Sequence, residues 1–343
     1  MQVSTIGLDI AKNVFQAHGI DAAGRTVITR QLRRGQVMGY FDNLPPCLIG
    51  MEACATAHHW ARELTKMGHT VQLMPASYVK AYVKRSKNDA ADAAAICEAV
   101  TRPSMRFVPM KTIDQQAALM LHRTRDLLIR QRTQLTNALR AHFAELGMVA
   151  ARGTDGVKGL VAIVTDTANA TQLPGPMKQA MQALVSQLAA LEAQIGQLER
   201  SIHAQHCASD QSRRLETIPG IGVIGATAIA ATVTDPSAFK SGREFAAWIG
   251  LVPRQNSTGG KERLGGISKQ GDRYLRRLLV IGATAVIRQA RTHPDKHPWV
   301  MKLLAKKPAK VVAIALANKM ARIAWAVLDK GETYRAPVLA AAA

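Results

Sequence analysis

Short apolar runs alternate with a helical pattern through the first hundred residues, and this alternation most restricts the possible folds. The runs are VSTIGLDIA, VFQAHGI, TVITRQL, CLIGMEA and TVQLMP, with HHWARELTKMG between the last two. Short apolar runs bounded by Gly, Asp or Pro are typical of strands, whereas HHWARELTKMG favours a helix. The tight turn DAAGR predicts an antiparallel meander of three strands, followed by strand, helix and strand. We therefore expect a mixed α/β sheet domain.

Two long helical patterns follow this domain. Residues 112–146 are expected to form one helix with a recurrent leucine, at Leu121, Leu128, Leu135, Leu139 and Leu146. A second helix, about 178–206, has apolar residues at alternating spacings of four and three, at Leu184, Leu188, Leu191, Ile195, Leu198 and Ile202. This spacing is the heptad pattern of a coiled coil, formed either within one chain or between chains. The segments RGTDGVKG and LPGPM between the helices are expected to be loops.

Apolar helical patterns resume after residue 210 and are interrupted by the polar stretch PRQNSTGGKERLGGISKQGD. The predicted class is therefore α/β plus α. We expect an α/β domain over residues 1–110, a helical coiled-coil region over 111–207, a mostly helical C-terminal domain over 208–335, and a flexible tail over 336–343.

The chain is strongly basic. It contains 45 Lys and Arg against 24 Asp and Glu, which gives a net charge of +21 and a pI near 10.3. Most of this excess lies in the last two-fifths of the sequence, around glycine-rich turns. Solubility alone could explain a basic surface, but this clustering favours a nucleic-acid partner. The sequence has no long uncharged apolar run, signal-peptide pattern or paired cysteines, so we expect a cytoplasmic protein without membrane partners.

Four acidic residues follow the predicted strands or begin a helix. Asp9 lies in IGLDIAK and Glu52 in CLIGMEA, while Asp89 and Asp92 share one helical face in KNDAADAAAI. Carboxylates from two strands and one helix could hold a pair of divalent cations about 3.5–4 Å apart, as in ribonuclease H-like nucleases. Taken singly, each has a structural explanation. Asp9 could form a turn and Glu52 could cap a helix. Asp89 could be an N-cap, with Asp92 a favourable charge in the first turn.

Basic residues and glycines near these positions predict phosphate contacts. A group just before the aspartate pair could hold a nucleic-acid backbone, although a solvated helix face explains it nearly as well: Lys80, Lys84, Arg85 and Lys87. The segment IPGIG, with Gly220 and Gly222, is typical of a helix-hairpin-helix element, in which backbone amides bind phosphate. An ordinary glycine-rich helix connection is the alternative.

A hydroxyl-bearing loop lies within the polar stretch. Ser257 and Thr258 precede two glycines and are surrounded by cations: Arg254, Lys261, Arg263, Lys269, Arg273, Arg276 and Arg277. Such surroundings suit either a phosphoryl-transfer nucleophile or a phosphate-binding loop. No histidine is placed to act as the base for this hydroxyl.

The ordered set of motifs resembles a known family. GLDIAK, GMEACATAHHWA, KNDAADA, IPGIG and GLVPRQNSTGGKERLGGISKQGDRYLRRLL are similar to motifs of the insertion-sequence one-ten transposases, and most closely to the eleven-eleven subgroup. The resemblance covers about residues 3–330. It implies a DEDD recombinase with an N-terminal RuvC-like domain, a coiled coil that drives assembly, and a C-terminal domain that supplies a nucleophilic serine.

Carried over by motif, the tetrad falls on Asp9, Glu52, Asp89 and Asp92, with Mg²⁺ or Mn²⁺ as cofactor. The nucleophile falls on Ser257, with Thr258 as the alternative. The resemblance also implies a structured noncoding bridge RNA that pairs with donor and target DNA, so that the protein reads backbone and shape. A dimer that assembles into a tetramer would join the tetrad of one protomer to the serine of another, in a bacterial, nucleoid-associated setting.

Two other functions are compatible with the residues. A RuvC-like junction resolvase would hydrolyse DNA with metal-activated water and would form no covalent intermediate. A nucleic-acid-binding scaffold would use the carboxylates structurally and would carry out no chemistry.

Overall fold

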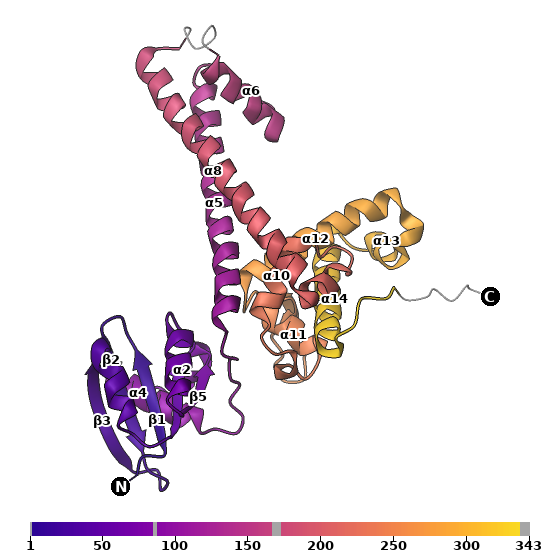
Figure 1. Ribbon diagram of the computed structural model, residues 1–343. Helices are drawn as coiled ribbons and strands as arrows, with labels where there is room; N and C mark the ends of the chain where they lie inside the picture. The colour runs from indigo at the N-terminus through magenta and orange to yellow at the C-terminus, as the bar shows by residue number, and fades with distance from the viewer. Residues whose placement is uncertain (1, 85–87, 167–172, 337–343) are drawn as a thin grey trace, which may run out of the picture. The chain divides into compact units, whose positions relative to one another are not determined.

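The computed structural model describes residues 2–84, 88–166 and 173–336. The chain divides into two compact units, Met1–Thr112 and Ile113–Ala343, which are described separately (Figure 1). Of the predicted tail, residues 337–343 lie outside the described part of the chain. The division of the second unit into a coiled-coil region and a C-terminal domain stays a prediction.

A five-stranded mixed sheet forms the centre of the first unit, in the order β3-β2-β1-β4-β5. Its strands are β1 (Thr5–Ile10), β2 (Val14–Ile20), β3 (Thr26–Arg33), β4 (Leu48–Glu52) and β5 (Thr70–Met74). The first three strands are antiparallel neighbours, and β4 runs parallel to both β1 and β5. The predicted meander and the mixed α/β class are confirmed.

One face of this sheet is apolar and packs against α1 (Val37–Asp42) and α2 (Ala57–Lys66). Leu8 of β1 and Met51 of β4 are fully buried there, in contact with the core that includes Trp60 of α2. Because successive side chains of a strand point to opposite faces, the residues between these apolar positions face the other side of the sheet.

The other face is covered by α4 (Asp89–Val100), which follows α3 (Ala76–Val79). This helix lies directly on the backbone of β1 and β4. A Cβ atom at Gly7 would be 2.1 Å from the Ala93 carbonyl oxygen, and one at Gly50 would be 2.7 Å from Val100 Cβ. Only glycine leaves room for this approach at either position, and the approach fixes where the first turn of α4 lies.

The first half of the second unit is a pair of long helices, α5 (Ile113–Ala144) and α8 (Gly175–Ala208), which run antiparallel (Figure 1). An ion pair joins them, with Arg125 Nε 2.9 Å from Glu199 Oε1. The predicted apolar positions Leu188, Leu191 and Ile195 are buried on α8. This agrees with the intramolecular hairpin, while an intermolecular coiled coil stays a prediction.

Both loop predictions between the long helices are wrong in part, since α8 begins at Gly175 within LPGPM. The segment RGTDGVKG was expected to be a loop, but α6 (Thr154–Thr165) begins within it. Leu160 and Val164 are buried against α5 and α8, so helical packing outweighs the low helix propensity of Gly156 and Gly159.

The rest of the second unit is a helical bundle with one small hairpin. Its elements are α9 (Asp210–Glu216), α10 (Val223–Thr232), α11 (Gly242–Ile249), β6 (Pro253–Gln255), β7 (Leu264–Ile267), α12 (Arg273–Thr292), α13 (Pro298–Leu304) and α14 (Ala309–Lys330). Helix α14 is long and apolar enough to cross a membrane by length and composition. Its buried residues, including Met320 and Ala324, belong to the core of this unit, as expected of a core helix.

Replacing Gly7 with Ala is expected to lower the free energy of unfolding by about 1–3 kcal/mol, because the added methyl group would force α4 away from β1. Urea denaturation of the full chain measures this change. Gly39→Ala is the matched control, since nothing lies within 4 Å of that Cβ position in α1 and the substitution favours a helix. Equal stabilities for the two variants would contradict the close contact.

Candidate active site

The two strand carboxylates lie side by side on the face that α4 covers. Leu8 of β1 pairs with Met51 of β4, so the next residues, Asp9 and Glu52, are adjacent across the two parallel strands. Each lies two residues after a glycine that α4 contacts, Gly7 or Gly50, so both acids are on the same face as these glycines. Both are partly buried. The fold therefore brings together the acids at the ends of these two strands.

Helix α4 runs antiparallel to β1, and its contacts with the strand are in regular step. The Cys97 thiol lies 3.8 Å from the Thr5 carbonyl oxygen, and Ala93 lies against Gly7. Four helical residues rise about 6 Å and two strand residues about 6.6 Å, so one further step would bring Asp89 to the level of Asp9. Asp92, three residues later in the same first turn, follows the same helical face. This register therefore predicts that the four acids lie toward one end of one sheet face.

The start of α4 also decides one of the structural alternatives. The Asn88 side chain accepts a hydrogen bond from the Ala91 amide at 2.7 Å, so the N-cap is Asn88 and not Asp89. Asp89 is exposed and Asp92 is partly buried. A favourable interaction with the helix dipole remains available to both, in addition to any ligand role.

The Cys54 thiol reports on the strand carboxylates. Partial desolvation of the thiol is the largest cause that raises the pKa of Cys54, and the negative charges of Glu52 and Asp9 raise that pKa further. Both carboxylates therefore act on the thiol that follows β4.

Carboxylate oxygens are the ligands that Mg²⁺ prefers, so the donor chemistry fits a hard divalent cation. However, no group of three acidic, His or Cys side chains among the described residues is close enough to hold an ion. Lys80 and Lys84 are exposed on the segment that leads toward α4. The predicted phosphate contacts Arg85 and Lys87 lie outside the described residues.

Ser257 lies near the tip of the hairpin formed by β6 and β7. Gly259 and Gly260 both have positive φ, at 54° and 77°, as a two-residue type I′ turn requires. Thr258 bridges to Lys261, and the Asn256 amide donates to the Arg263 carbonyl at 2.9 Å. The polar stretch was expected only to interrupt helices, and it instead contains this hairpin.

The hairpin register has a consequence for the serine. It places Ser257 opposite Glu262, so a carboxylate faces the hydroxyl-bearing residue across the two strands. Sequence reasoning missed Glu262, although the Gly-Gly pair between Thr258 and Lys261 is itself a hairpin signal. Ser257 is exposed, and no described residue hydrogen-bonds its hydroxyl group.

The predicted cations around this hairpin fall into two groups. Arg276 donates to the carbonyl oxygens of Ile249 and Gln270, at 2.7 and 2.8 Å, and Arg277 pairs with Asp126. These two side chains are used within the protein, as is Arg254, which donates to the Ser268 carbonyl at 3.2 Å. The others are exposed and carry no ion pair with a described residue: Lys261, Arg263, Lys269 and Arg273.

The two glycines of IPGIG have different surroundings. Gly220 has φ of 89°, and its carbonyl oxygen would be 1.8 Å from a Cβ atom at Gly282 of α12. Close packing of this hairpin on α12 therefore requires glycine at both Gly220 and Gly282. Gly222 is exposed at the N-cap of α10, where nothing lies within 4 Å of its Cβ position. Phosphate binding at this hairpin stays a prediction.

Metal binding by the strand carboxylates is expected to change the reactivity of Cys54. A cation between Asp9 and Glu52 would offset the charges that raise the thiol pKa, so Mg²⁺ should lower that pKa and speed alkylation near pH 8. Iodoacetamide kinetics would be measured in a Cys207→Ser background, because Cys207 is the other exposed cysteine.

Asp9→Asn should speed this alkylation without Mg²⁺ and should reduce the effect of Mg²⁺. Asp42→Asn, at an exposed acid in α1, is the charge-matched control. An Mg²⁺ effect that is identical in both variants would show that the cation does not bind at Asp9.

Comparison with known proteins agrees with this arrangement. A family model described as the transposase IS116/IS110/IS902 family matches residues 212–297, and a model for DEDD transposases of the IS110 type matches residues 6–148. The second match covers β1, β4 and the start of α4, on which all four acids lie.

Full-length relatives extend the similarity. A probable family 20 transposase of Pseudomonas aeruginosa is 51% identical over 337 residues, covering 98% of this chain and 99% of the relative. The transposase for insertion sequence element IS1111A of Coxiella burnetii is 40% identical over 334 residues, covering 97% of this chain and 92% of the relative. The transposase for element IS1328 of Yersinia enterocolitica is 41% identical over 334 residues, covering 97% and 98%. The chain belongs to the IS110 family of insertion-sequence transposases.

Proposed function

We propose that this transposase excises and integrates its own element through a covalent phosphoserine at Ser257. The observation that supports its metal-dependent part is the step of α4 along β1, from which we infer that Asp89 lies near Asp9 at the end of the sheet. In a RuvC-like domain this is where acids would act on a phosphodiester. The IS110-family membership supplies DNA cleavage and rejoining as the reaction class.

The tetrad would hold Mg²⁺, or Mn²⁺ in its place, through Asp9, Glu52, Asp89 and Asp92. Bound there, the ion would supply charge stabilisation for the attacking and leaving oxygens of an in-line displacement. The chain would set the position of the ion with two oxygen donors from adjacent strands and two from one helical turn.

Ser257 would supply the nucleophile. Its Oγ atom forms a bond to the DNA phosphorus while one bridging P–O bond breaks, and the departing DNA oxygen takes up a proton as a hydroxyl group. Glu262, opposite Ser257 in the hairpin, is the carboxylate that can accept the serine proton. Lys261 and Arg263, which flank Glu262 in the hairpin, are exposed and can hold the DNA backbone.

Sequence specificity is proposed to reside in a bridge RNA that pairs with donor and target DNA. The protein would then read backbone and shape, which fits its high net charge and its 4% content of aromatic residues. Dimers that assemble into tetramers would complete the reaction, in the bacterial cytoplasm and in association with the nucleoid.

Ser257→Ala is expected to abolish the covalent protein–DNA adduct, because alanine has no nucleophilic oxygen. The assay would combine labelled DNA from the element's ends, RNA transcribed from its noncoding end and Mg²⁺, followed by denaturing electrophoresis. Thr258→Ala is the matched control and should retain the adduct. An adduct lost in Thr258→Ala and kept in Ser257→Ala would move the nucleophile to Thr258.

The other two functions predict different results in this assay. A junction resolvase would cleave DNA equally well as the Ser257→Ala protein and would form no adduct at any time. A scaffold would show no cleavage, and Asp9→Asn would leave all of its activities unchanged.

Glu262→Gln is expected to slow adduct formation by about tenfold or more, since the serine loses a proton acceptor. Single-turnover rates measured against pH would test this, with Glu332→Gln as an exposed control outside the hairpin. A rate equal to that of the control would remove Glu262 from the mechanism.

RNA guidance has a separate test. The protein would be expressed with its flanking element DNA and purified at high salt, and the bound nucleic acid would be sequenced. One discrete noncoding RNA from the element's flank is the expected result. Heterogeneous fragments would contradict guidance and favour the resolvase, which can be assayed on branched DNA.

A further inference from the structure

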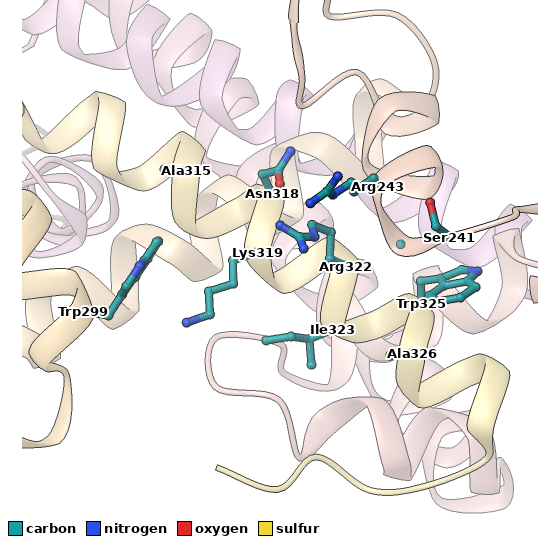
Figure 2. Close-up of a pocket in the computed structure, with 11 residues that line it drawn as sticks. Ser241, Arg243, Trp299, Ala315, Asn318, Lys319, Arg322, Ile323, Trp325 and Ala326 are labelled. Carbon is teal, nitrogen blue, oxygen red and sulfur yellow. The ribbon is translucent and has the colours of Figure 1, made fainter. Parts of the chain in front are cut away.

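A second cationic site lies in the bundle of the second unit, away from the serine hairpin. It is an open groove of about 800 Å³ between the start of α11, the middle of α14 and Trp299 of α13 (Figure 2). None of its lining residues belongs to the tetrad or to the hairpin. The mechanism proposed above leaves this groove unused.

The groove gathers three cations and no acid. Arg243 comes from the first turn of α11, while Lys319 and Arg322 come from α14. Figure 2 shows the guanidinium groups of Arg243 and Arg322 pointing toward the same space. No carboxylate among the described residues forms an ion pair with any of the three. Such a cluster of like charges has the electrostatic character of an anion site.

These side chains project from a rigid base. The start of α11 packs tightly on α14, since a Cβ atom at Gly242 would lie 2.9 Å from the Arg322 carbonyl oxygen. Asn318 of α14 donates its side-chain N–H to the Leu251 carbonyl at 3.2 Å, which fixes the orientation of the amide group. The distance between the two helices is therefore set by packing, and it holds the two arginines near each other.

An aromatic ring adjoins the cations. The Lys319 ammonium lies 4.4 Å from the centroid of the Trp299 ring, and 38% of Trp299 is exposed. Trp325, at the other side of the groove, donates its indole N–H to the Pro236 carbonyl at 3.1 Å and so keeps a fixed position. Cations beside an exposed indole can bind a phosphate and an unpaired base together. A free inorganic anion would make no use of the indole.

We propose that this groove binds a single nucleic-acid strand, with its phosphates on Arg243, Arg322 and Lys319 and one unpaired base stacked on Trp299. The inference rests on the proposed function for the class of ligand, and it adds a binding site that is separate from the chemistry. RNA and DNA strands share the recognised groups, so the test must distinguish them.

The test measures equilibrium binding by the full-length protein in EDTA, so that no cleavage occurs. The probes are fluorescein-labelled oligouridylate, oligothymidylate and a DNA duplex of the same length, read by anisotropy over a range of NaCl concentrations. The double variant Arg243→Gln/Arg322→Gln is compared with Arg288→Gln/Arg291→Gln. The control removes the same charge from exposed positions of α12, outside the groove.

The groove variant should bind single strands about tenfold more weakly, and the slope of log K against log salt should fall by about 1.4 for two lost phosphate contacts. Trp299→Ala should weaken single-strand binding by about fivefold or more and leave duplex binding unchanged, and Trp299→Phe should restore most of the loss. Tighter binding of oligouridylate than of oligothymidylate would identify RNA as the occupant, and the reverse would identify DNA.

Equal losses in the groove and control variants would overturn the proposal, as would a Trp299→Ala effect of equal size on duplex. The Ser257→Ala protein distinguishes this binding site from the proposed chemistry, because it should bind every probe as the natural protein does. Groove variants that bind normally while the Ser257 adduct still forms would refute this site alone. Absence of single-strand binding by the natural protein would refute this site, while the proposed function would still be decided by the adduct assay.

Discussion

The contact between α4 and β1 at Gly7 is the constraint on which the candidate active site depends. A helix can approach a strand this closely only where no side chain separates the two backbones, and Gly7 and Gly50 provide that space on neighbouring strands. The contact sets the helix in step with the strand, so that its first turn arrives where β1 and β4 end. Backbone packing thus fixes the strand ends and the helix start that carry the predicted acids, with more precision than loops would give.

Packing also explains which parts of this arrangement could be predicted from sequence. The strand at Thr5–Ile10 and the helix at Asp89–Val100 have strong local patterns, and the acids stand out because a basic chain contains few of them. The placement of Asp89 near Asp9 is inferred from the contact of Ala93 with Gly7, two residues more than eighty positions apart, so no local pattern records it. The helix at Thr154–Thr165 was missed for a related reason, since burial on α5 and α8 outweighs its glycines.

The positive charge of the second unit has more than one role. Arg276 and Arg277 hold the protein together, through backbone carbonyls and through Asp126, although composition alone grouped them with the phosphate contacts. Composition equally gave no sign of the groove, because Arg243 and Arg322 are far apart in sequence and meet only when α11 packs on α14. The pairing of Ser257 with Glu262 could have been predicted from sequence, because the two adjacent glycines indicate a hairpin turn.

A cation site shared by α4, β1 and β4 is tested most simply by the affinity of the full-length protein for Mn²⁺, measured by electron paramagnetic resonance of the free ion. If helix and strands form one cation site, Asp9→Asn and Asp89→Asn should each weaken the tightest binding by about tenfold or more, as expected for loss of a direct ligand. Unchanged Mn²⁺ affinity in Asp89→Asn, with loss in Asp9→Asn, would show that α4 does not contribute to the site and would contradict this account.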